Sequence, residues 1–412
     1  PPTLVSFAIT GGDVHKVITP ELKEAGHVLV EFMLPKDEFH VFDFEALRKQ
    51  FDAVEALIQS GKAYSAYTVK DGGLVEAVYK MAFGNEIGVA FDDALTLNDL
   101  VEKNFGHIIV EVDNAEVVAG YENVRIIAST NEEKAVSYKG EKVTLDDAYE
   151  INCAPLESVY PTTAKAPTTE VRTGDCNERG KMFASKKYDE VNVVIPVFPG
   201  TNCEYDSAKA FERAGADTIV KVFKNLDAES IRESVDEFEK AINQAQIIMF
   251  PGGFSAGDEP DGSAKFFATA FRNAKMKEAV EKLLNERDGL ALGICNGFQA
   301  LIKLGLVPNG KITGQDAQSP TLTFNTINRH ISKMVYTKVV SNLSPWLANA
   351  ELGGVYCNPA SHGEGRFVAP KEWLDKLFAN GQVATQYCDL DGNVSMDEEW
   401  NVNGSYRAIE GI

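Results

Sequence analysis

The sequence predicts an α+β region followed by an α/β region built on a doubly wound parallel sheet. In the first region, short strand-like and helix-like segments follow one another without strict alternation, which is typical of α+β proteins. From Val191 onward, runs of β-branched residues alternate with amphipathic segments, which is typical of parallel strands covered by helices on both faces. Large apolar side chains are scarce between the two regions, and we interpret that stretch as a linker. The predicted boundaries are 1–162, 163–188 and 189–412.

The composition is that of a soluble globular protein with two or three domains, since 44% of the 412 residues are hydrophobic and 25% are charged. The net charge of −21 argues against a nucleic-acid partner and against binding to an anionic membrane. We expect neither a membrane span nor a signal peptide. The six cysteines form no close pair and no C-x-x-C motif, so we expect no disulfide, no metal site and a cytoplasmic location.

In the first region, alternating or continuous apolar runs predict strands, and apolar positions three and four apart predict helices. The sequence Asp71-Gly72-Gly73 opens one of these helices. A helix N-terminus favours a phosphate, although such a glycine turn is commoner without a ligand. The predicted strands are 4–10, 26–34, 64–69, 107–112 and 124–130, and the predicted helices are 42–61, 74–84 and 144–151.

In the second region, three loops that could carry chemistry follow predicted strands. They are Pro199–Asn202, Pro251–Phe254 and the turn at Cys295. Ligands gather at the carboxyl ends of the strands in a doubly wound sheet, so we expect these loops to converge. The predicted strands are 191–200, 217–223, 246–253 and the run that begins at Leu290, and the predicted helices are 206–214, 228–244 and 263–285.

Cys295 is the candidate nucleophile. It stands between Gly293 and Gly297 after a predicted strand and before a predicted helix, which is the pattern of a nucleophile elbow with a thiol. The glycines permit a sharp turn, and the helix N-terminus favours the reactive thiolate. The alternative is a buried structural cysteine at the end of a strand.

Residues near this elbow could complete an acyl-transfer site. The backbone N–H of Gly253 or Phe254, together with that of Asn296, could form an oxyanion hole, unless Gly253 belongs to an ordinary glycine turn. Gln299 lies four residues after Cys295, on the same helix face, and could reach a substrate above the thiol or could simply be solvated.

His362 and Glu364 form a His-x-Glu pair that could act as base and orienting carboxylate. A loop histidine with a structural role, or one that only lies near the substrate, is the alternative. The choice between these roles stays open on the residues alone.

The motif GICNGFQ, residues 293–299, resembles the elbow of class I glutamine amidotransferases. Five further motifs resemble the glutaminase domain of phosphoribosylformylglycinamidine synthase, a family of purine biosynthesis. Residues 1–162 resemble the C-terminal domain of the second half of that family's synthetase part, which shares its fold with aminoimidazole ribonucleotide synthetase. The five motifs are FPGTNCEYD (198–206), FPGGFSAGD (250–258), PTLTFN (320–325), SHGEGRF (361–367) and ATQYCDLDGN (384–393).

The resemblance implies an α+β synthetase-type C-terminal domain followed by an α/β doubly wound, flavodoxin-like glutaminase domain. It implies that Cys295 forms a thioester with glutamine and that Asn325 binds the substrate. The ammonia then passes to the N-terminal synthetase part of the same enzyme, which is the implied partner and converts formylglycinamide ribonucleotide to its amidine. That step uses ATP and Mg²⁺, and the glutaminase step requires no cofactor.

Two departures qualify this resemblance. The family's catalytic His-x-Glu follows a final strand, and residues 408–412 resemble the approach to it, so we expect that pair beyond residue 412 and expect the chain to be the C-terminal portion of the long single-chain form. His362 and Glu364 then belong to another loop. The family's His-Asp-x-Ser-Asp-Gly-Gly is replaced by residues 67–73 of this chain, which leaves only Lys70 and Asp71 as nucleotide contacts.

Three hypotheses follow. The chain is a glutaminase that uses Cys295 covalently, or it is a catalytically silent folding and docking module of the same enzyme, or it is an unrelated cysteine hydrolase that uses Cys295 and His362.

Overall fold

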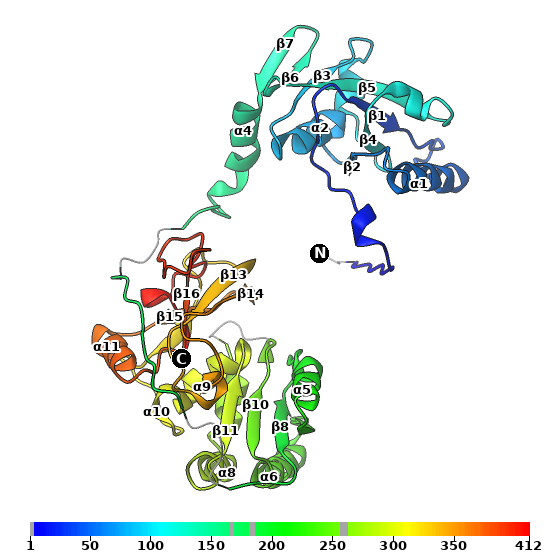
Figure 1. The fold of residues 1–412 in the computed structure, drawn as a ribbon. Coiled ribbons are helices and arrows are strands. Elements are labelled where there is room, and N and C mark those ends of the chain that lie inside the picture. The colour runs from blue at the N-terminus through cyan, green and yellow to red at the C-terminus, as the bar shows by residue number, and fades with distance from the viewer. Residues whose placement is uncertain (1–3, 165–168, 181–185, 256–262) are drawn as a thin grey trace. The chain divides into compact units, whose positions relative to one another are not determined.

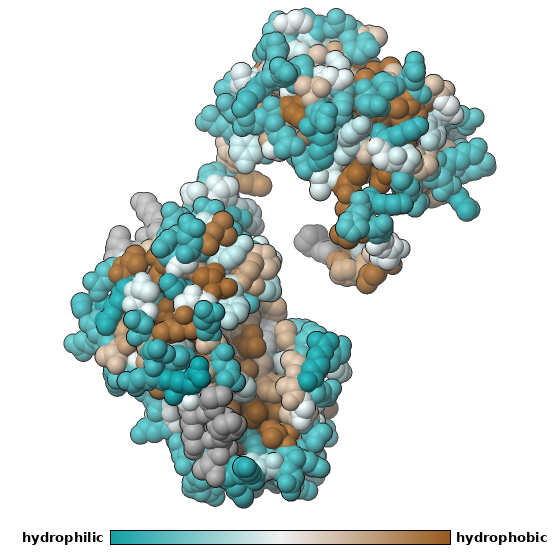
Figure 2. Space-filling model, in the orientation of Figure 1, coloured by the Kyte–Doolittle hydropathy of each residue, from teal (hydrophilic) through white to brown (hydrophobic). Residues whose placement is uncertain are grey.

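A computed structural model describes residues 4–164, 169–180, 186–255 and 263–412 (Figure 1). The chain forms two compact units, Pro1–Val159 and Tyr160–Ile412. Residues 165–168 and 181–185 of the predicted linker, and residues 256–258 of the motif FPGGFSAGD, lie outside the described residues. No helix in the described ranges is both long enough and apolar enough to span a membrane. Hydrophilic residues cover most of the visible surface of both units (Figure 2).

The first unit contains a seven-stranded mixed sheet in the order β2-β4-β1-β5-β3-β6-β7, in which only β3 and β6 pair in parallel. Leu29 packs into one apolar cluster with helix α2, and Val30 packs into another with helix α1, so the sheet has a core on each face. The strands are β1 Val28–Phe32, β2 Ser65–Thr68, β3 Gly88–Phe91, β4 Ile108–Val112, β5 Val124–Asn131, β6 Ala135–Tyr138 and β7 Glu141–Thr144, and the helices are α1 Phe44–Gln59, α2 Gly73–Phe83, α3 Leu97–Val101 and α4 Leu145–Glu157.

The predicted strand at 4–10 is wrong, because this segment is irregular and Leu4 and Ile9 are 95% and 98% exposed. The other predicted strands and helices of this unit are present. Strand β3, helix α3 and the hairpin of β6 and β7 were not predicted from the sequence. That hairpin turns at Lys139 and Gly140, both with positive φ, which is the two-residue turn suited to twisted strands.

The second unit contains a four-stranded parallel sheet in the order β11-β10-β8-β9. Val194 and Ile248 face a core formed with the helices α6 to α9, whereas Val193 and Met249 face the opposite side and α5. The sheet is therefore covered on both faces, as predicted. The elements are β8 Asn192–Val197, α5 Glu204–Arg213, β9 Asp217–Val222, α6 Ala228–Gln244, β10 Ile247–Phe250, α7 Lys265–Phe271, α8 Ala274–Asn285, β11 Leu290–Gly293, α9 Asn296–Leu304 and α10 Leu306–Asn309.

The single helix predicted at 263–285 is two helices. Helix α7 ends at Phe271, and the side chain of Asn273 accepts a hydrogen bond from the Lys275 N–H and so caps the start of α8.

A second, antiparallel sheet in the order β14-β13-β16-β17, with the separate pair β12 and β15, completes the unit. We predicted no strands here apart from a strand-like end. The elements are β12 Thr321–Thr323, β13 Ile331–Val339, β14 Val355–His362, β15 Arg366–Val368, α11 Lys371–Ala379, β16 Thr385–Tyr387 and β17 Ile409–Gly411.

The described part of the predicted linker lies against this second unit. The Gly174 N–H donates to Gln386 Oε1 at 2.8 Å, and the Gly180 N–H donates to the Asn342 carbonyl at 2.9 Å. The buried Arg407 forms an ion pair with Glu170 at 2.6 Å. Residues 169–180 therefore pack along the surface of the second unit.

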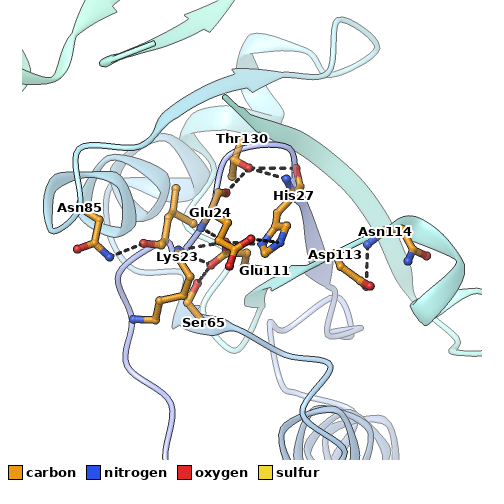
Figure 3. Close-up of polar contacts among 10 residues, drawn as sticks. Lys23, Glu24, His27, Ser65, Asn85, Glu111, Asp113, Asn114 and Thr130 are labelled. Carbon is orange, nitrogen blue, oxygen red and sulfur yellow. Dashed lines mark hydrogen bonds and ion pairs between the residues drawn. The ribbon is translucent and has the colours of Figure 1, made fainter. Parts of the chain in front are cut away.

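A buried carboxylate organises the first unit (Figure 3). Glu111, on β4, is fully buried and accepts hydrogen bonds from the backbone N–H groups of Lys23 and Glu24. Ser65 Oγ donates to it at 2.7 Å, and His27 Nδ1 lies 2.8 Å from it. One side chain thus ties the segment before β1 to strands β2 and β4.

We expect Glu111→Gln to destabilise the first unit by about 3 kcal/mol, because the amide NH₂ would face donors and leave buried groups unpaired. Urea denaturation of the chain measures this change. The exposed Glu116 provides the matched control, Glu116→Gln, which should change stability by less than about 0.5 kcal/mol. Equal stability of the two variants would contradict the organising role of the Glu111 carboxylate.

Candidate active site

Cys295 has the backbone of a nucleophile elbow. It joins β11 to α9 with φ 54° and ψ −112°, a conformation that non-glycine residues rarely adopt and that the surroundings must impose. A β-carbon on Gly297 would overlap the Phe250 carbonyl oxygen, and one on Gly293 would lie 2.6 Å from the Gly297 oxygen. Both glycines are therefore required by packing, and the turn leaves the Cys295 side chain exposed.

The loops at the ends of the parallel strands converge at Cys295, as expected. Thr201 and Gly253 form a β-bridge. A β-carbon on Gly252 would lie 3.3 Å from Cys203 Sγ and 3.4 Å from Cys295 Cβ, so all three loops meet there. Cys295 lines a cavity of about 430 Å³ whose walls include Gly253, Phe254, Gln299, His362 and Glu364.

Of the two alternative oxyanion donors on the strand-end loop, one is occupied. The Phe254 N–H donates to the Gly200 carbonyl at 2.8 Å, so this donor holds two loops together and does not point to an oxyanion. Gly253, with φ 135°, remains the candidate on that loop. Asn296 opens helix α9, where backbone N–H groups point out of the helix end. The oxyanion role of Gly253 and Asn296 remains a prediction.

Gln299 connects the helix to the facing loop. Its Nε2 donates to the Glu364 carbonyl at 2.7 Å, and its Oε1 accepts from Asn296 Nδ2 at 2.9 Å. Asn296 Oδ1 in turn accepts from the Ser255 N–H at 3.3 Å. Gln299 lines the cavity, but its amide already serves this network, and its contact with a substrate remains a prediction.

His362 and Glu364 reach the same cavity as Cys295 but do not pair with each other in the described chain. Glu364 Oε2 accepts from the Ser263 N–H at 3.1 Å. His362 Nδ1 is buried and has no hydrogen-bond partner among the described residues. Burial lowers the pKa of His362, so the ring is neutral at pH 7. A neutral ring suits a base, but none of the carboxylates that the structure describes bonds to it.

Asn325 lies beneath the cavity wall rather than in it. It is 2% exposed, and its Nδ2 donates to the carbonyls of His362 (2.8 Å) and Arg329 (3.0 Å). Its Oδ1 accepts from the Gly365 N–H at 3.2 Å. These bonds use its amide to hold two loops, so a direct substrate contact stays a prediction. Arg329 and His330 also line the cavity, and the sequence analysis missed both because no motif marks them.

Cys295 also lines a second hollow, an apolar groove of about 570 Å³. Within the described sheet, β11 pairs only with β10, so its other edge faces this groove. Trp346 Nε1 covers part of that edge by donating to the Ala291 carbonyl at 2.9 Å. Phe298, Pro308 and Ile412 are among the other residues of the wall.

In the first unit, Lys70 and Asp71 stand just before α2. Lys70 lies over the Tyr67 ring, and Asp71 forms an ion pair with Lys103 at 3.1 Å. The Gly72 N–H donates to Glu76 Oε2 at 2.7 Å, so a carboxylate of the same helix occupies part of the expected phosphate position. A nucleotide contact by Lys70 and Asp71 remains a prediction. The described ranges contain no cluster of three His, Cys, Asp or Glu side chains suited to a metal ion.

Residues 190–412 match the model of the family described as CobB/CobQ-like glutamine amidotransferase domain. The chain is 35% identical to the phosphoribosylformylglycinamidine synthase subunit PurQ of Methanococcus maripaludis over 216 residues, which cover 52% of this chain and 73% of the relative. It is 26% identical to the probable phosphoribosylformylglycinamidine synthase of Arabidopsis thaliana over 463 residues, which cover 99% of this chain and 32% of the relative. The solved PurLQS structure from Thermotoga maritima aligns with a TM-score of 0.36 and 26% identity, over 53% of this chain and 80% of that chain.

We expect Gly297→Ala to disrupt the elbow, since the added methyl group meets the Phe250 backbone. The free energy of unfolding should fall by about 1–3 kcal/mol, and the rate at which iodoacetamide alkylates Cys295 should change as well. Urea denaturation and mass spectrometry of the labelled peptide measure both effects. Gly314→Ala is the control, because a β-carbon there meets nothing within 4 Å. Indistinguishable behaviour of the two variants would refute the packing requirement.

The buried His362 should make the second unit sensitive to acid. Its folded pKa is lowered from the ordinary value of 6.5, so the unfolded chain binds the proton more readily and stability falls as the pH drops below about 6.5. His362→Gln should lose less stability than the parent between pH 8 and pH 5 in urea denaturation. His330→Gln, a change at an exposed position, should follow the parent. Parallel curves for all three proteins would exclude His362 as the source.

Proposed function

The chain belongs, through residues 190–412, to the CobB/CobQ-like glutamine amidotransferase domain family, and on this basis we propose that it hydrolyses glutamine through a thioester at Cys295. The observation that carries the proposal is the elbow: a cysteine with positive φ stands at the end of a parallel strand, exposed to a cavity. A structural cysteine would not require this strained backbone.

The proposed reaction begins when the Cys295 thiolate attacks the carboxamide carbon of glutamine. The N–H groups of Gly253 and Asn296 stabilise the negative charge that develops on the carbonyl oxygen. Ammonia leaves after it takes up a proton, and the acyl group remains on sulfur as a thioester. Water then cleaves the thioester, which releases glutamate and restores the thiol.

The proton-transfer base is the part of the site with two candidates. We propose that the base is the histidine of a His-x-Glu pair that the resemblance implies after residue 412. We assign this pair to the groove beside the edge of β11 that does not pair with β10, because Cys295 lines both this groove and the cavity of about 430 Å³. His362 is the second candidate, because it shares the cavity with Cys295 and has a neutral ring. No carboxylate in the described parts of the chain orients its ring, which favours the first assignment.

We assign the ammonia to an ATP-dependent synthetase part, as the names of the relatives suggest. The overall reaction would convert formylglycinamide ribonucleotide to its amidine, with ATP and Mg²⁺ used outside the glutaminase site. The chain spans about a third of the Arabidopsis relative, so the synthetase activity belongs to the remainder of such an enzyme. The first unit would be a synthetase-type C-terminal domain. The order β9-β8-β10-β11 supports a flavodoxin-like second unit.

The second candidate function is a silent docking module of the same enzyme. The observation that favours it is the absence of a formed histidine–carboxylate pair at the thiol within the described residues. This function predicts that the chain neither hydrolyses glutamine nor forms a covalent adduct at Cys295 with a glutamine-like electrophile.

Glutamate release from glutamine by the chain and its variants tests the proposal. Cys295→Ala should abolish any hydrolysis, by more than about a thousandfold, because the covalent route is lost. Cys357→Ala, a change at another exposed cysteine, should leave the rate unchanged.

The His362→Ala variant separates the two candidate bases. Our assignment predicts that Cys295 of this variant still forms a covalent adduct with a glutamine-like electrophile, detected by mass spectrometry. An equal loss of hydrolysis in Cys295→Ala and His362→Ala would establish His362 as the base. A parent that neither hydrolyses glutamine nor forms the adduct would leave only the docking module.

A further inference from the structure

The cavity at Cys295 carries two formal charges of opposite sign. Arg329 and Glu364 both line it, and the other titratable side chains in its described wall are Cys295, His330 and His362. Among the described residues no carboxylate forms an ion pair with Arg329, whereas Arg172 pairs with Asp375 and Arg407 pairs with Glu170 and Asp375. The described part of the cavity wall therefore combines a cation that pairs with no described carboxylate and a carboxylate that the Ser263 N–H holds in place.

The scaffold holds these charges in a defined relation. Asn325 Nδ2 donates to the Arg329 carbonyl at 3.0 Å, and the Asn328 N–H donates to the Asn325 carbonyl at 2.8 Å, which closes the turn that carries Arg329. The same Asn325 side chain binds the His362 carbonyl and the Gly365 N–H on either side of Glu364. One buried amide thus fixes both charged residues to the cavity wall.

The Glu364 carboxylate forms part of the cavity wall and is fixed in position. It is only 8% exposed, and one of its oxygens accepts from the Ser263 N–H at 3.1 Å. Its own backbone carbonyl accepts from Gln299, which comes from the helix that begins at the nucleophile. Its distance from the thiol is therefore set by helix α9.

We infer that this pair recognises the head group of a free α-amino acid: Arg329 binds the α-carboxylate and Glu364 binds the α-ammonium group. The inference rests on the proposed function and names the residues that select its substrate. A guanidinium binds a carboxylate through two parallel N–H donors, and a buried carboxylate with a remaining lone pair accepts from an ammonium. A zwitterion held there directs its side-chain amide toward Cys295. The site then accepts glutamine but rejects glutamine residues within peptides, whose α-groups are uncharged amides.

Two alkylating probes on the full chain test the role of Arg329. The probe 6-diazo-5-oxo-L-norleucine carries the amino-acid head group, whereas iodoacetamide reports only the reactivity of the thiol. We expect Arg329→Gln to slow labelling of Cys295 by the first probe about ten- to a hundredfold, and to leave labelling by iodoacetamide unchanged. Arg329→Lys should recover part of the rate because it keeps the charge. Arg232→Gln, a change at an exposed arginine of α6, should behave as the parent.

Two truncated competitors test the pairing of each charge. Glutaramate lacks the α-ammonium group of glutamine, and 4-aminobutanamide lacks the α-carboxylate. The parent should be protected from the diazo probe best by glutamine. Arg329→Gln should lose the advantage of glutamine over 4-aminobutanamide and retain its advantage over glutaramate. Glu364→Gln, which keeps an oxygen for the Ser263 N–H, should show the reverse pattern.

The outcomes distinguish this inference from the proposed function. If the parent is labelled by the diazo probe and Arg329→Gln is labelled equally fast, the inference is overturned and the glutaminase proposal stands. The same holds if both variants lose both advantages equally, because the charges then act only on the fold. If the parent reacts with iodoacetamide but not with the diazo probe, the proposed function fails, and the inference fails with it.

Discussion

The contact of helix α9 with the end of β10 is the constraint on which the site depends. Gly297 packs against the Phe250 carbonyl so closely that no side chain fits between them. This contact forces the chain to leave β11 and enter α9 within two residues, Ile294 and Cys295, and Cys295 takes up the positive φ of 54°. Strain of this kind costs about 1–3 kcal/mol and persists only where the surrounding packing imposes it. The buried face of α9, which includes Ala300 and Leu304 in the largest apolar cluster, provides that packing.

The parallel sheet and the elbow could be predicted from the sequence because their signals are local. The strand that begins at Asn192 is a continuous apolar run, and the glycines on either side of Cys295 report a backbone requirement directly. The antiparallel sheet could not be predicted in the same way. Strand β14 is largely exposed, contains Pro359 and shows no alternation, and its conformation comes from pairing with β13 over eight residues.

The same contrast between local signals and contacts across the chain explains which residues of the site could be predicted from the sequence. Arg329 belongs to no recognisable motif. Its place in the cavity wall depends on Asn325, which closes the turn before β13. The resemblance to a family indicated that Asn325 matters, but the structure shows its amide bonded to two loops. Gln299 is similar, since its helical position places it on the side of Cys295, whereas one of its two partners, the Glu364 carbonyl, comes from a loop 65 residues away. Buried amides in such sites must satisfy all their hydrogen bonds, and this requirement makes them scaffold as well as lining.

Cys295 lies between two hollows. This position separates substrate selection from proton transfer, two tasks that a hydrolytic site must combine. One wall of the thiol faces a polar cavity with charges of both signs, and the other faces an apolar groove along an open strand edge. A zwitterionic substrate of the kind we propose would find counter-charges for its head group only in the cavity that Arg329 and Glu364 line. The apolar groove excludes such a ligand but suits an extended segment that pairs with β11 and loses no hydrogen bonds. Substrate selection and proton transfer can therefore be supplied by different segments, and the nucleophile need be oriented only once, by the turn that joins β11 to α9.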